Sequence, residues 1–288
     1  MQGNIVSFSA NILQEVTIVD KGKISVIMAV FNCADTIHQS IESIISQTYD
    51  NWEFIICDDC STDNTLEIVR EYEAKYPNKF KIIQNEKNSR LAFSLNHCLE
   101  YVNGEFVARM DGDDYVAPDR FEKQISFLME HPDIHLVGSA MQSFDNNKLG
   151  RIITYKPFPE KEDLRKGPCF AHASILTYAY TYKETGGYTV SARTMRTQDY
   201  DLWFRFYAKG FKGANLDDPL YYYREDEYAY LRRKPKLYLW AVVTRFKGFR
   251  LLKFPLHYYV YTLTPIVGLV YNEMRKLKAK FTLKRKSK

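Results

Sequence analysis

The stretch Phe106–Asp114, FVARMDGDD, joins a short apolar run directly to three carboxylates, those of Asp111, Asp113 and Asp114. The apolar part is typical of a buried β-strand, and three carboxylates at one strand end repel each other unless a cation neutralises them. Oxygen ligands suit Mg²⁺ or Mn²⁺, which commonly take further ligands from waters and substrate phosphates. The stretch therefore indicates an α/β domain that binds a metal and a nucleoside diphosphate. The alternative is that Asp113 or Asp114 caps the helix that begins near Pro118.

A second strand end is also acidic. The run Glu53–Cys57 is typical of a short buried strand, and Asp58 and Asp59 follow it directly. An earlier run, Ser25–Val30, ends at Phe31. Because ligands of open α/β sheets bind outside the carboxyl ends of the strands, we expect these ends to meet at one crevice.

Strand and helix patterns alternate along the first part of the chain. Hydrophobic periodicity predicts strands at 24–30, 52–57, 79–84 and 105–110, and helices at 35–47, 62–75 and 89–102. This order is typical of a parallel, Rossmann-type nucleotide-binding half. The later pattern is mixed, with helices at 121–130 and 197–209 and strands at 134–144, 151–155 and 218–224.

Composition narrows the class of protein. With 288 residues, 45% of them hydrophobic, the chain is expected to form one α/β domain plus an appendage. Its five cysteines include one CxxC pair, Cys57 and Cys60, and no second pair or paired histidines, which argues against zinc. A redox role for that pair remains the alternative to simple packing. Reduced thiols and a start without a signal-peptide pattern favour the cytoplasm.

The C-terminal segment differs in charge from the rest. Residues Arg232–Lys288 contain 16 lysines and arginines and one acid, Glu273, whereas the remainder is net acidic. Within this segment, Phe254–Asn272 is uncharged and rich in tyrosine, which suits an anionic membrane surface better than nucleic acid. A transmembrane span is one alternative, because about 20 apolar residues suffice. A basic helical pair packed on the domain is the other.

Five motifs resemble those of glycosyltransferase family 2, the large GT-A group of nucleotide-sugar-dependent enzymes. In chain order they are SVIMAVFN, IICDDCSTDNT, GEFVARMDGDD, GGY and RTQDYDLWFR, and together they span about Lys23 to Arg224. The stretches RLAFSLNHCL and ARMDGDD are most similar to bacterial exopolysaccharide and capsule members. The resemblance implies a GT-A fold: an α/β protein with a Rossmann-like nucleotide-binding half and a mixed central sheet, followed here by a basic, amphipathic helical tail.

Four segments follow from this interpretation. We expect an N-terminal extension at 1–22, a nucleotide-sugar-binding half at 23–117, an acceptor-binding half at 118–230 and a membrane-associating tail at 231–288.

A divalent metal would stabilise the charge that develops on the departing diphosphate. Asp113 is the expected first metal ligand, with Asp111 on the ribose or the metal and Asp114 assisting or capping. The resemblance implies that the other donor-binding residues are Ala29, Phe31, Asp58, Asp59 and Arg90. Of these, Phe31 could equally be a core aromatic residue.

Three positions depart from the family pattern. Ala29 stands where many members have proline, and Gln198 replaces an acid. Leu95 replaces an arginine, so Arg90 is expected to supply that charge. His172 and the run Gly186–Tyr188 match the family, with the glycines implied in a turn near the acceptor cleft.

The acceptor hydroxyl needs a general base. Asp199 aligns with the family's base and starts a helix, whose dipole favours an ionised carboxylate. Asp201 is expected to pair with Arg205 at i, i+4. With no second carboxylate to act as a nucleophile, a single inverting displacement follows. Simple N-capping by Asp199 remains the alternative.

The expected function is transfer of a sugar from a nucleoside-diphosphate sugar, in particular a UDP-sugar, to a hydroxyl of a lipid-linked or saccharide acceptor. The expected location is the cytoplasmic face of the plasma membrane, as a peripheral protein of bacterial surface or exopolysaccharide biosynthesis. A sugar nucleotidyltransferase would ordinarily show a Gly-rich loop where this chain has FNCAD. A non-catalytic regulator that retains the fold is the other alternative, although Asp59, Asp113 and Asp199 are all present.

Overall fold

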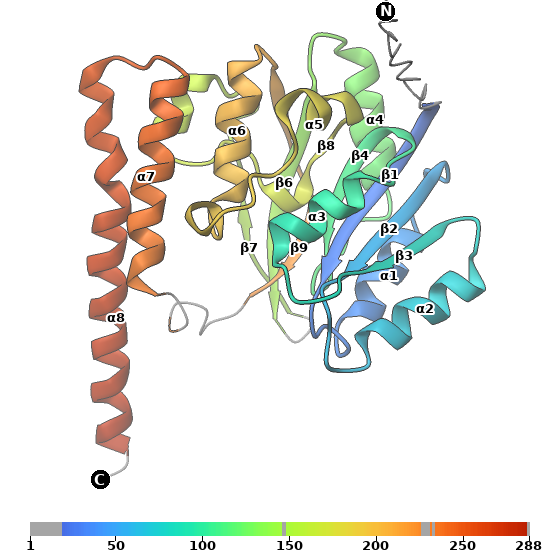
Figure 1. The fold of residues 1–288 in the computed structure, drawn as a ribbon, viewed down its shortest axis with the longest axis horizontal. Coiled ribbons are helices and arrows are strands. Elements are labelled where there is room, and N and C mark those ends of the chain that lie inside the picture. Colours follow the sequence, from blue (N-terminus) through green and yellow to red (C-terminus); the bar gives the residue numbers. More distant parts are fainter. Residues whose placement is uncertain (1–18, 146–147, 226–230, 232–233, 287–288) are drawn as a thin grey trace, which may run out of the picture.

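A mixed sheet of nine strands forms the centre of the molecule (Figure 1). The computed structural model describes residues 19–145, 148–225, 231 and 234–286, with side chains as far as residue 278; most of the predicted extension at 1–22 lies outside this range. The strand order is β3-β2-β1-β4-β8-β6-β9-β5, and β7 pairs with β6. The strands are β1 (Asp20–Val30), β2 (Trp52–Asp58), β3 (Phe80–Gln84), β4 (Gly104–Asp111), β5 (Tyr115–Val116), β6 (Leu136–Asp145), β7 (Lys148–Ile153), β8 (Leu176–Tyr178) and β9 (Gly213–Arg224).

The first four strands in chain order are parallel, as the sequence predicted. The apolar runs of β1, β2 and β4 are buried on both faces of the sheet, which explains why they form continuous rather than alternating hydrophobic stretches. Beyond β4 the sheet is mixed, because β8 runs antiparallel to both β4 and β6 and β9 runs parallel to β6. The predicted mixed α/β sheet is therefore confirmed, and it is continuous across both predicted halves.

Helices cover both faces of the sheet. On one face, α1 (Ile37–Ile45), α2 (Thr65–Lys75) and α4 (Arg120–Glu130) enclose one core cluster. On the other face, α3 (Leu91–Leu99), α5 (Ala179–Thr185) and α6 (Gln198–Ala208) enclose a second cluster (Figure 1). On α1, for example, an apolar stripe of Ile37, Ile41 and Ile44 is buried against the sheet.

The sequence patterns did not predict several short elements. The strands β5 and β8 and the helix α5 were not predicted, because elements this short repeat the hydrophobic period too few times for the pattern to be recognised. The last strand, β9, begins at Gly213 rather than Asp218, and its pairing register with β6 shifts near Pro219. Asp217, Asp218 and Pro219 are unfavourable in strands, so the sequence pattern did not predict that the strand continues through this irregularity.

The C-terminal segment forms a helical hairpin. It contains α7 (Pro235–Leu251), a 3₁₀ stretch at Leu256–Leu263 and α8 (Thr264–Lys286). Phe249 is fully buried with its ring centroid 5.9 Å from that of Phe204 on α6, and a Cβ on Gly248 would overlap the same ring. The segment is therefore not a separable tail, since α7 completes the core of the domain. In the part of the chain that the structure describes, no helix has both the length and the hydropathy to cross a membrane.

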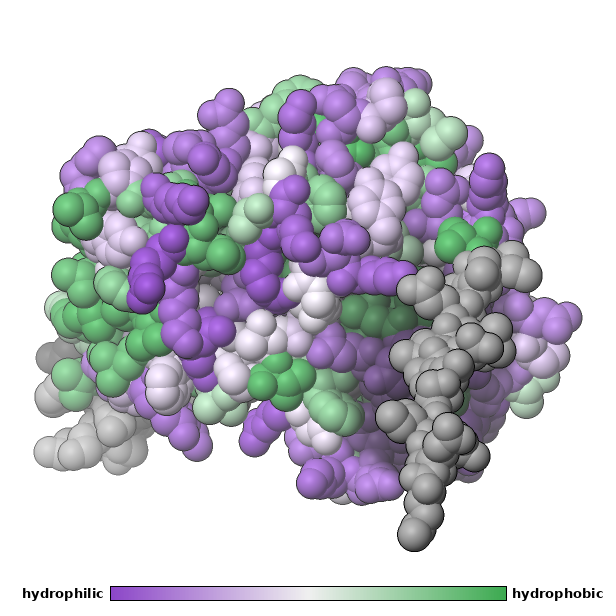
Figure 2. Space-filling model, turned by 45° about the horizontal axis from the view of Figure 1, so that its top comes forward, coloured by the Kyte–Doolittle hydropathy of each residue, from purple (hydrophilic) through white to green (hydrophobic). Residues whose placement is uncertain are grey.

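The hairpin carries many exposed apolar side chains. Figure 2 shows hydrophobic side chains gathered at the left of the molecule, the side on which α7 and α8 lie in Figure 1. We call this set the hairpin surface; it comprises Leu239, Trp240, Phe246, Leu251, Leu256, Val260, Leu263, Val267, Val270, Tyr271, Met274 and Leu277. Exposed apolar surface of this extent commonly marks a site of interaction.

Candidate active site

The strand ends that the sequence singled out lie side by side. In the pairing of β1 with its two neighbours, Ala29 is level with both Cys57 and Asp111, and Val30 is level with Asp58. The carboxyl ends of β2 and β4 therefore flank that of β1, and the expected meeting of acidic strand ends at one edge of the sheet is confirmed.

Asp58 and Phe31 lie at this edge in different environments. The Asp58 side chain is fully buried; its Oδ2 accepts a hydrogen bond of 3.1 Å from the backbone N–H of Ser61. Its Oδ1 is buried without a hydrogen-bond partner among the described residues, an arrangement that costs free energy unless a ligand donates to it. The Phe31 ring is 45% exposed, so the alternative of a core aromatic residue at this position is wrong.

The Asp59 carboxylate is hydrogen-bonded to other residues of the protein. Its carboxylate accepts hydrogen bonds of 2.8 Å from Asn85 Nδ2 and of 2.7 and 2.8 Å from the backbone N–H groups of Ser89 and Arg90. These bonds hold the loop before α3, in which Arg90 has a φ of +76°, a value strained for any residue other than glycine. The structure thus places Asp59 as the anchor of the loop that presents the exposed Arg90.

Arg109 is a site residue that sequence reasoning missed. Its buried guanidinium donates one hydrogen bond of 2.9 Å to Asp111 Oδ2 and a second, short one to Asp111 Oδ1. Such a bidentate pair orients the carboxylate firmly. A charged side chain in the otherwise apolar run of β4 was the available signal, because burying an unpaired charge is very unfavourable.

The other two acids of the DGDD motif have different surroundings. Asp113 is exposed and its side chain accepts no hydrogen bond from another described residue; partial loss of hydration and the charge of Asp111 raise its pKa. Asp114 is buried and accepts hydrogen bonds of 2.9 Å from the Tyr221 hydroxyl and 2.8 Å from the backbone N–H of Arg224. The expectation that Asp114 assists the metal or caps a helix is therefore corrected: it ties β4 to β9.

These carboxylates fit a divalent metal that is shared with a substrate. Among the described residues, no group of three or more His, Cys, Asp or Glu side chains could hold a metal ion. Asp113, alone or with Asp111, would supply one or two carboxylate ligands. This is the number that Mg²⁺ commonly uses when phosphates and waters supply its other ligands. Although Arg109 contacts both oxygens of Asp111, each oxygen retains a further lone pair.

Asp199 lies in the first turn of α6. The helix N-cap residue is Thr197 rather than Asp199, although the Asp199 carboxylate accepts hydrogen bonds from backbone N–H groups of the first turn, as a capping side chain does. The Asp199 side chain is half-buried; burial raises its pKa, while backbone N–H groups and the charge of Arg109 oppose the rise. A carboxylate with a raised pKa is a stronger base than an ordinary aspartate.

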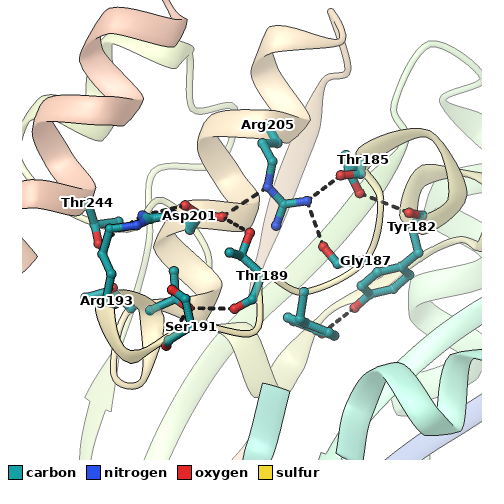
Figure 3. Close-up of polar contacts among 12 residues, drawn as sticks. Tyr182, Thr185, Gly187, Thr189, Ser191, Arg193, Asp201, Arg205 and Thr244 are labelled. Carbon is teal, nitrogen blue, oxygen red and sulfur yellow. Dashed lines mark hydrogen bonds and ion pairs between the residues drawn. The ribbon is translucent and has the colours of Figure 1, made fainter. Parts of the chain in front are cut away.

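Asp201 has a structural role. Its carboxylate accepts hydrogen bonds from Arg193 at 2.8 Å, Arg205 at 3.1 Å and the Thr189 hydroxyl at 2.6 Å (Figure 3). The predicted pairing with Arg205 is confirmed, and Arg205 also donates to the backbone carbonyl of Gly187. Asp201 thereby holds the loop between α5 and α6, and these partners lower its pKa against the effect of burial.

The GGY motif joins this loop to α3. Both glycines have positive φ angles, +76° for Gly186 and +65° for Gly187, and a Cβ on Gly187 would overlap the side-chain amide of Asn96. That amide forms two hydrogen bonds with the backbone of Tyr188, of 2.8 and 2.7 Å. The glycines therefore permit a close approach that fixes the turn.

His172 belongs to a hydrogen-bonded group of side chains close enough to Arg109 to feel its charge. Its Nε2 lies 2.8 Å from the Tyr188 hydroxyl, which in turn lies 2.8 Å from the Tyr182 hydroxyl. Burial, together with the positive charge of Arg109, holds the pKa of His172 well below its usual value. The imidazole is therefore neutral at physiological pH and serves as a hydrogen-bonding support.

The sequence and the fold match a known family. A family model described as glycosyl transferase family 2 matches residues 25–184, more than half of the chain. A mannosyltransferase from Pyrobaculum calidifontis, solved in complex with GDP-Man and Mn²⁺, superposes with a TM-score of 0.60 at 15% identity, covering 90% of this chain and 80% of that one. This likeness concerns the fold, which is GT-A.

Two curated relatives bear on the reaction. The putative glycosyltransferase EpsE of Bacillus subtilis (strain 168) is 44% identical over 245 residues, 85% of this chain and 88% of the relative. WfaP of Escherichia coli, named a UDP-Glc:alpha-D-GlcNAc-diphosphoundecaprenol beta-1,3-glucosyltransferase, is 30% identical over 70% of this chain and 76% of its own length. The chain therefore belongs to glycosyltransferase family 2, as a nucleotide-sugar-dependent glycosyltransferase of bacterial polysaccharide biosynthesis.

Proposed function

We propose that this glycosyltransferase moves a sugar from a UDP-sugar to a hydroxyl of a lipid-linked acceptor, in a metal-dependent reaction that inverts the anomeric configuration. The observation that carries the proposal is the position of Arg109. It pairs directly with Asp111 at the end of β4, and its charge also acts on Asp113 and Asp199. One buried cation thus links the proposed metal ligands to the proposed base.

The donor side rests on four residues, Asp58, Phe31, Ala29 and Arg90, and on two metal ligands. The Oδ1 of Asp58 is buried without a described partner, so it could accept a hydrogen bond from a nucleoside base only after the strand end rearranges, whereas the exposed ring of Phe31 already offers a stacking surface. We also assign Ala29, at the end of β1, and the charged side chain of Arg90 to donor binding. A UDP-sugar donor agrees with the UDP-Glc named for the Escherichia coli relative. Asp113 and Asp111 would hold Mg²⁺ or Mn²⁺, which would neutralise charge on the departing UDP.

The acceptor side rests on Asp199. As the acceptor oxygen bonds to the anomeric carbon and the bond from that carbon to the diphosphate breaks, the hydroxyl proton passes to the Asp199 carboxylate. Asp114 and Asp201 are engaged in structural hydrogen bonds, and Asp111 and Asp113 are assigned to the metal, so none of these four carboxylates is proposed as a nucleophile for a covalent intermediate. A single displacement, and so inversion, is the mechanism that these residues support.

The acceptor class and the location rest on the helical hairpin. Its exposed apolar side chains are interspersed with cations such as Lys236, Lys247 and Arg250, a combination that favours binding at an anionic membrane surface. The diphosphoundecaprenol-linked acceptor named for the Escherichia coli relative agrees with such a location. We therefore place the enzyme at the cytoplasmic face of the plasma membrane, as a peripheral protein.

The test is a reaction panel. Purified enzyme is incubated with individual UDP-sugars and a synthetic lipid-diphosphate-linked sugar, with Mn²⁺ or Mg²⁺ or with EDTA, and the product's anomeric configuration is read by NMR. We expect transfer from one UDP-sugar that depends on the metal and inverts the configuration. Full activity in EDTA would refute the metal assignment, and a retained configuration would refute the single displacement. Activity only with other nucleotide sugars would refute the donor assignment.

A further inference from the structure

A cavity of about 300 Å³ lies between α7 and the turn that leads into α6. Its described lining residues are Arg196, Thr197, Leu237, Tyr238 and Ala241. Because Arg196 and Thr197 directly precede the first turn of α6, the cavity adjoins the segment that carries Asp199. It therefore lies on the acceptor side of the proposed reaction rather than among the donor-binding strand ends.

The walls of the cavity differ in character. Arg196 is exposed, has no hydrogen bond or ion pair with another described residue, and is the one charged side chain among the described lining residues. The opposite wall is apolar and aromatic, formed by Leu237, Tyr238 and Ala241 of α7. A guanidinium binds phosphate oxygens through paired hydrogen bonds, and an apolar wall binds hydrocarbon. Together they match a ligand that joins a phosphate group to a lipid chain.

The apolar wall continues into the hairpin surface. Leu239 and Trp240, next to Tyr238 on α7, are exposed. On α8, a Cβ added to Gly268 would lie 3.4 Å from the Tyr238 ring, so the two helices meet at this residue. Val267 on α8 is also exposed. Apolar side chains thus lead from the cavity to the face proposed to contact lipid.

The two walls are held in place relative to each other. Thr244 of α7 is buried, and its hydroxyl lies 3.1 Å from that of Thr197 and 3.3 Å from Nη1 of Arg193. Figure 3 shows Thr244 and Arg193 approaching each other from α7 and the loop before α6. The helix that carries the apolar wall is therefore attached to the turn that carries the cation and, two residues after Thr197, the proposed base.

We propose that this cavity binds the diphosphate end of a lipid-linked acceptor, with Arg196 on the phosphates and the α7 wall along the first part of the lipid chain. The assignment rests on the proposed function, because a lipid-linked acceptor is part of it. With the diphosphate held beside Arg196, the attached sugar lies next to the turn of α6 that bears Asp199. Arg196 is then a residue for acceptor binding and has no part in donor binding.

The test measures binding without requiring transfer. Farnesyl diphosphate is titrated into enzyme that is saturated with UDP and Mn²⁺, so that the probe cannot occupy the donor site, and farnesol serves as the probe without phosphate. We expect Arg196→Gln to weaken farnesyl diphosphate binding at least about tenfold, since it removes charge-assisted hydrogen bonds. Arg196→Lys should restore part of the affinity. Arg70→Gln, an exposed arginine on α2, is the matched control and should bind as wild type does.

A second variant tests the cavity itself. Ala241→Leu keeps the helix and the charge but fills the space, and it should weaken both farnesyl diphosphate and farnesol. The proposal is overturned if wild-type enzyme does not bind farnesyl diphosphate, or if Arg196→Gln binds it as well as wild type. It is also overturned if Arg196→Gln lowers the affinity for UDP equally, since the cavity would then serve the donor. Neither binding arm needs a productive reaction, so a failure of the proposed transfer remains distinguishable from a failure of this assignment.

Discussion

The guanidinium of Arg109 donates two hydrogen bonds to the carboxylate of Asp111, two residues later on the same strand. Because Arg109 is buried, its charge is poorly screened and extends to the neighbouring acids. It lowers the pKa of Asp199, while burial raises it, and the effect of burial is the larger. This one pair therefore bears on both the donor and the acceptor sides of the site.

The pH dependence of the reaction should report on Asp199. A general base acts in its ionised form, so kcat/KM is expected to fall as the pH decreases through the raised pKa of Asp199. Arg109→Gln removes the charge that lowers this pKa, so the acidic limb of the profile should move to higher pH. Arg109→Lys keeps the charge and should leave the limb near its wild-type position. An acidic limb that does not move in Arg109→Gln would argue against Asp199 as the base.

Asp113→Ala should abolish the metal dependence of donor binding. The variant removes the exposed carboxylate proposed as first metal ligand, and transfer is expected to fall by about 10²-fold or more, since a metal contributes several kcal/mol to stabilising the leaving group. UDP-sugar binding is measured by calorimetry with Mn²⁺ and with EDTA. Asp119→Ala, which removes a surface acid that pairs with Lys123, is the control and should behave as wild type. Metal-enhanced binding retained in Asp113→Ala would contradict the assignment.

Asp199→Asn and Asp201→Asn should fail in different ways. Asp199→Asn is expected to lower turnover by about 10² to 10⁴, the range of general base catalysis, with UDP-sugar affinity unchanged. Asp201→Asn deprives Arg193 and Arg205 of their partner, and it should lower the free energy of unfolding by about 1–3 kcal/mol. Turnover, donor affinity and denaturant unfolding of both variants separate the two effects. A stability loss in Asp199→Asn equal to that in Asp201→Asn would indicate a structural role for Asp199.

The hairpin surface should bind anionic membranes. Val267, Val270 and Met274 are exposed at 71%, 56% and 64%, and replacing all three with serine is expected to abolish flotation with anionic vesicles. Because these side chains are exposed, thermal stability should change little. The control variant replaces Met129 and Ile152, exposed apolar residues outside the hairpin, with serine. High salt should weaken wild-type binding, since it screens charge. Equal binding to neutral and anionic vesicles, or none to either, would contradict the prediction.

The order and type of the main elements were accessible from the sequence. The parallel half, its helices and the acidic ends of β2 and β4 follow from patterns within a few residues, because hydrophobic period and strand-end chemistry are local properties. The same holds for the pairing of Asp201 with Arg205, which a helix brings together at i, i+4. The five ordered motifs pointed to the family for the same reason.

Which acids remain free for a ligand was decided by the tertiary structure. Asp114 is bound by Tyr221 and by the backbone of Arg224, more than a hundred positions away in the chain, and no local pattern encodes that contact. Phe249 and Phe204 are also far apart in the sequence, so the burial of Phe249 against Phe204 was not predicted. This contact makes α7 part of the core rather than a tail. Whether a carboxylate can bind a ligand, and whether a helix packs on the domain, depends on partners that are distant in the sequence and come close only on folding. These partners determine which acids have a structural role and which can act at the site.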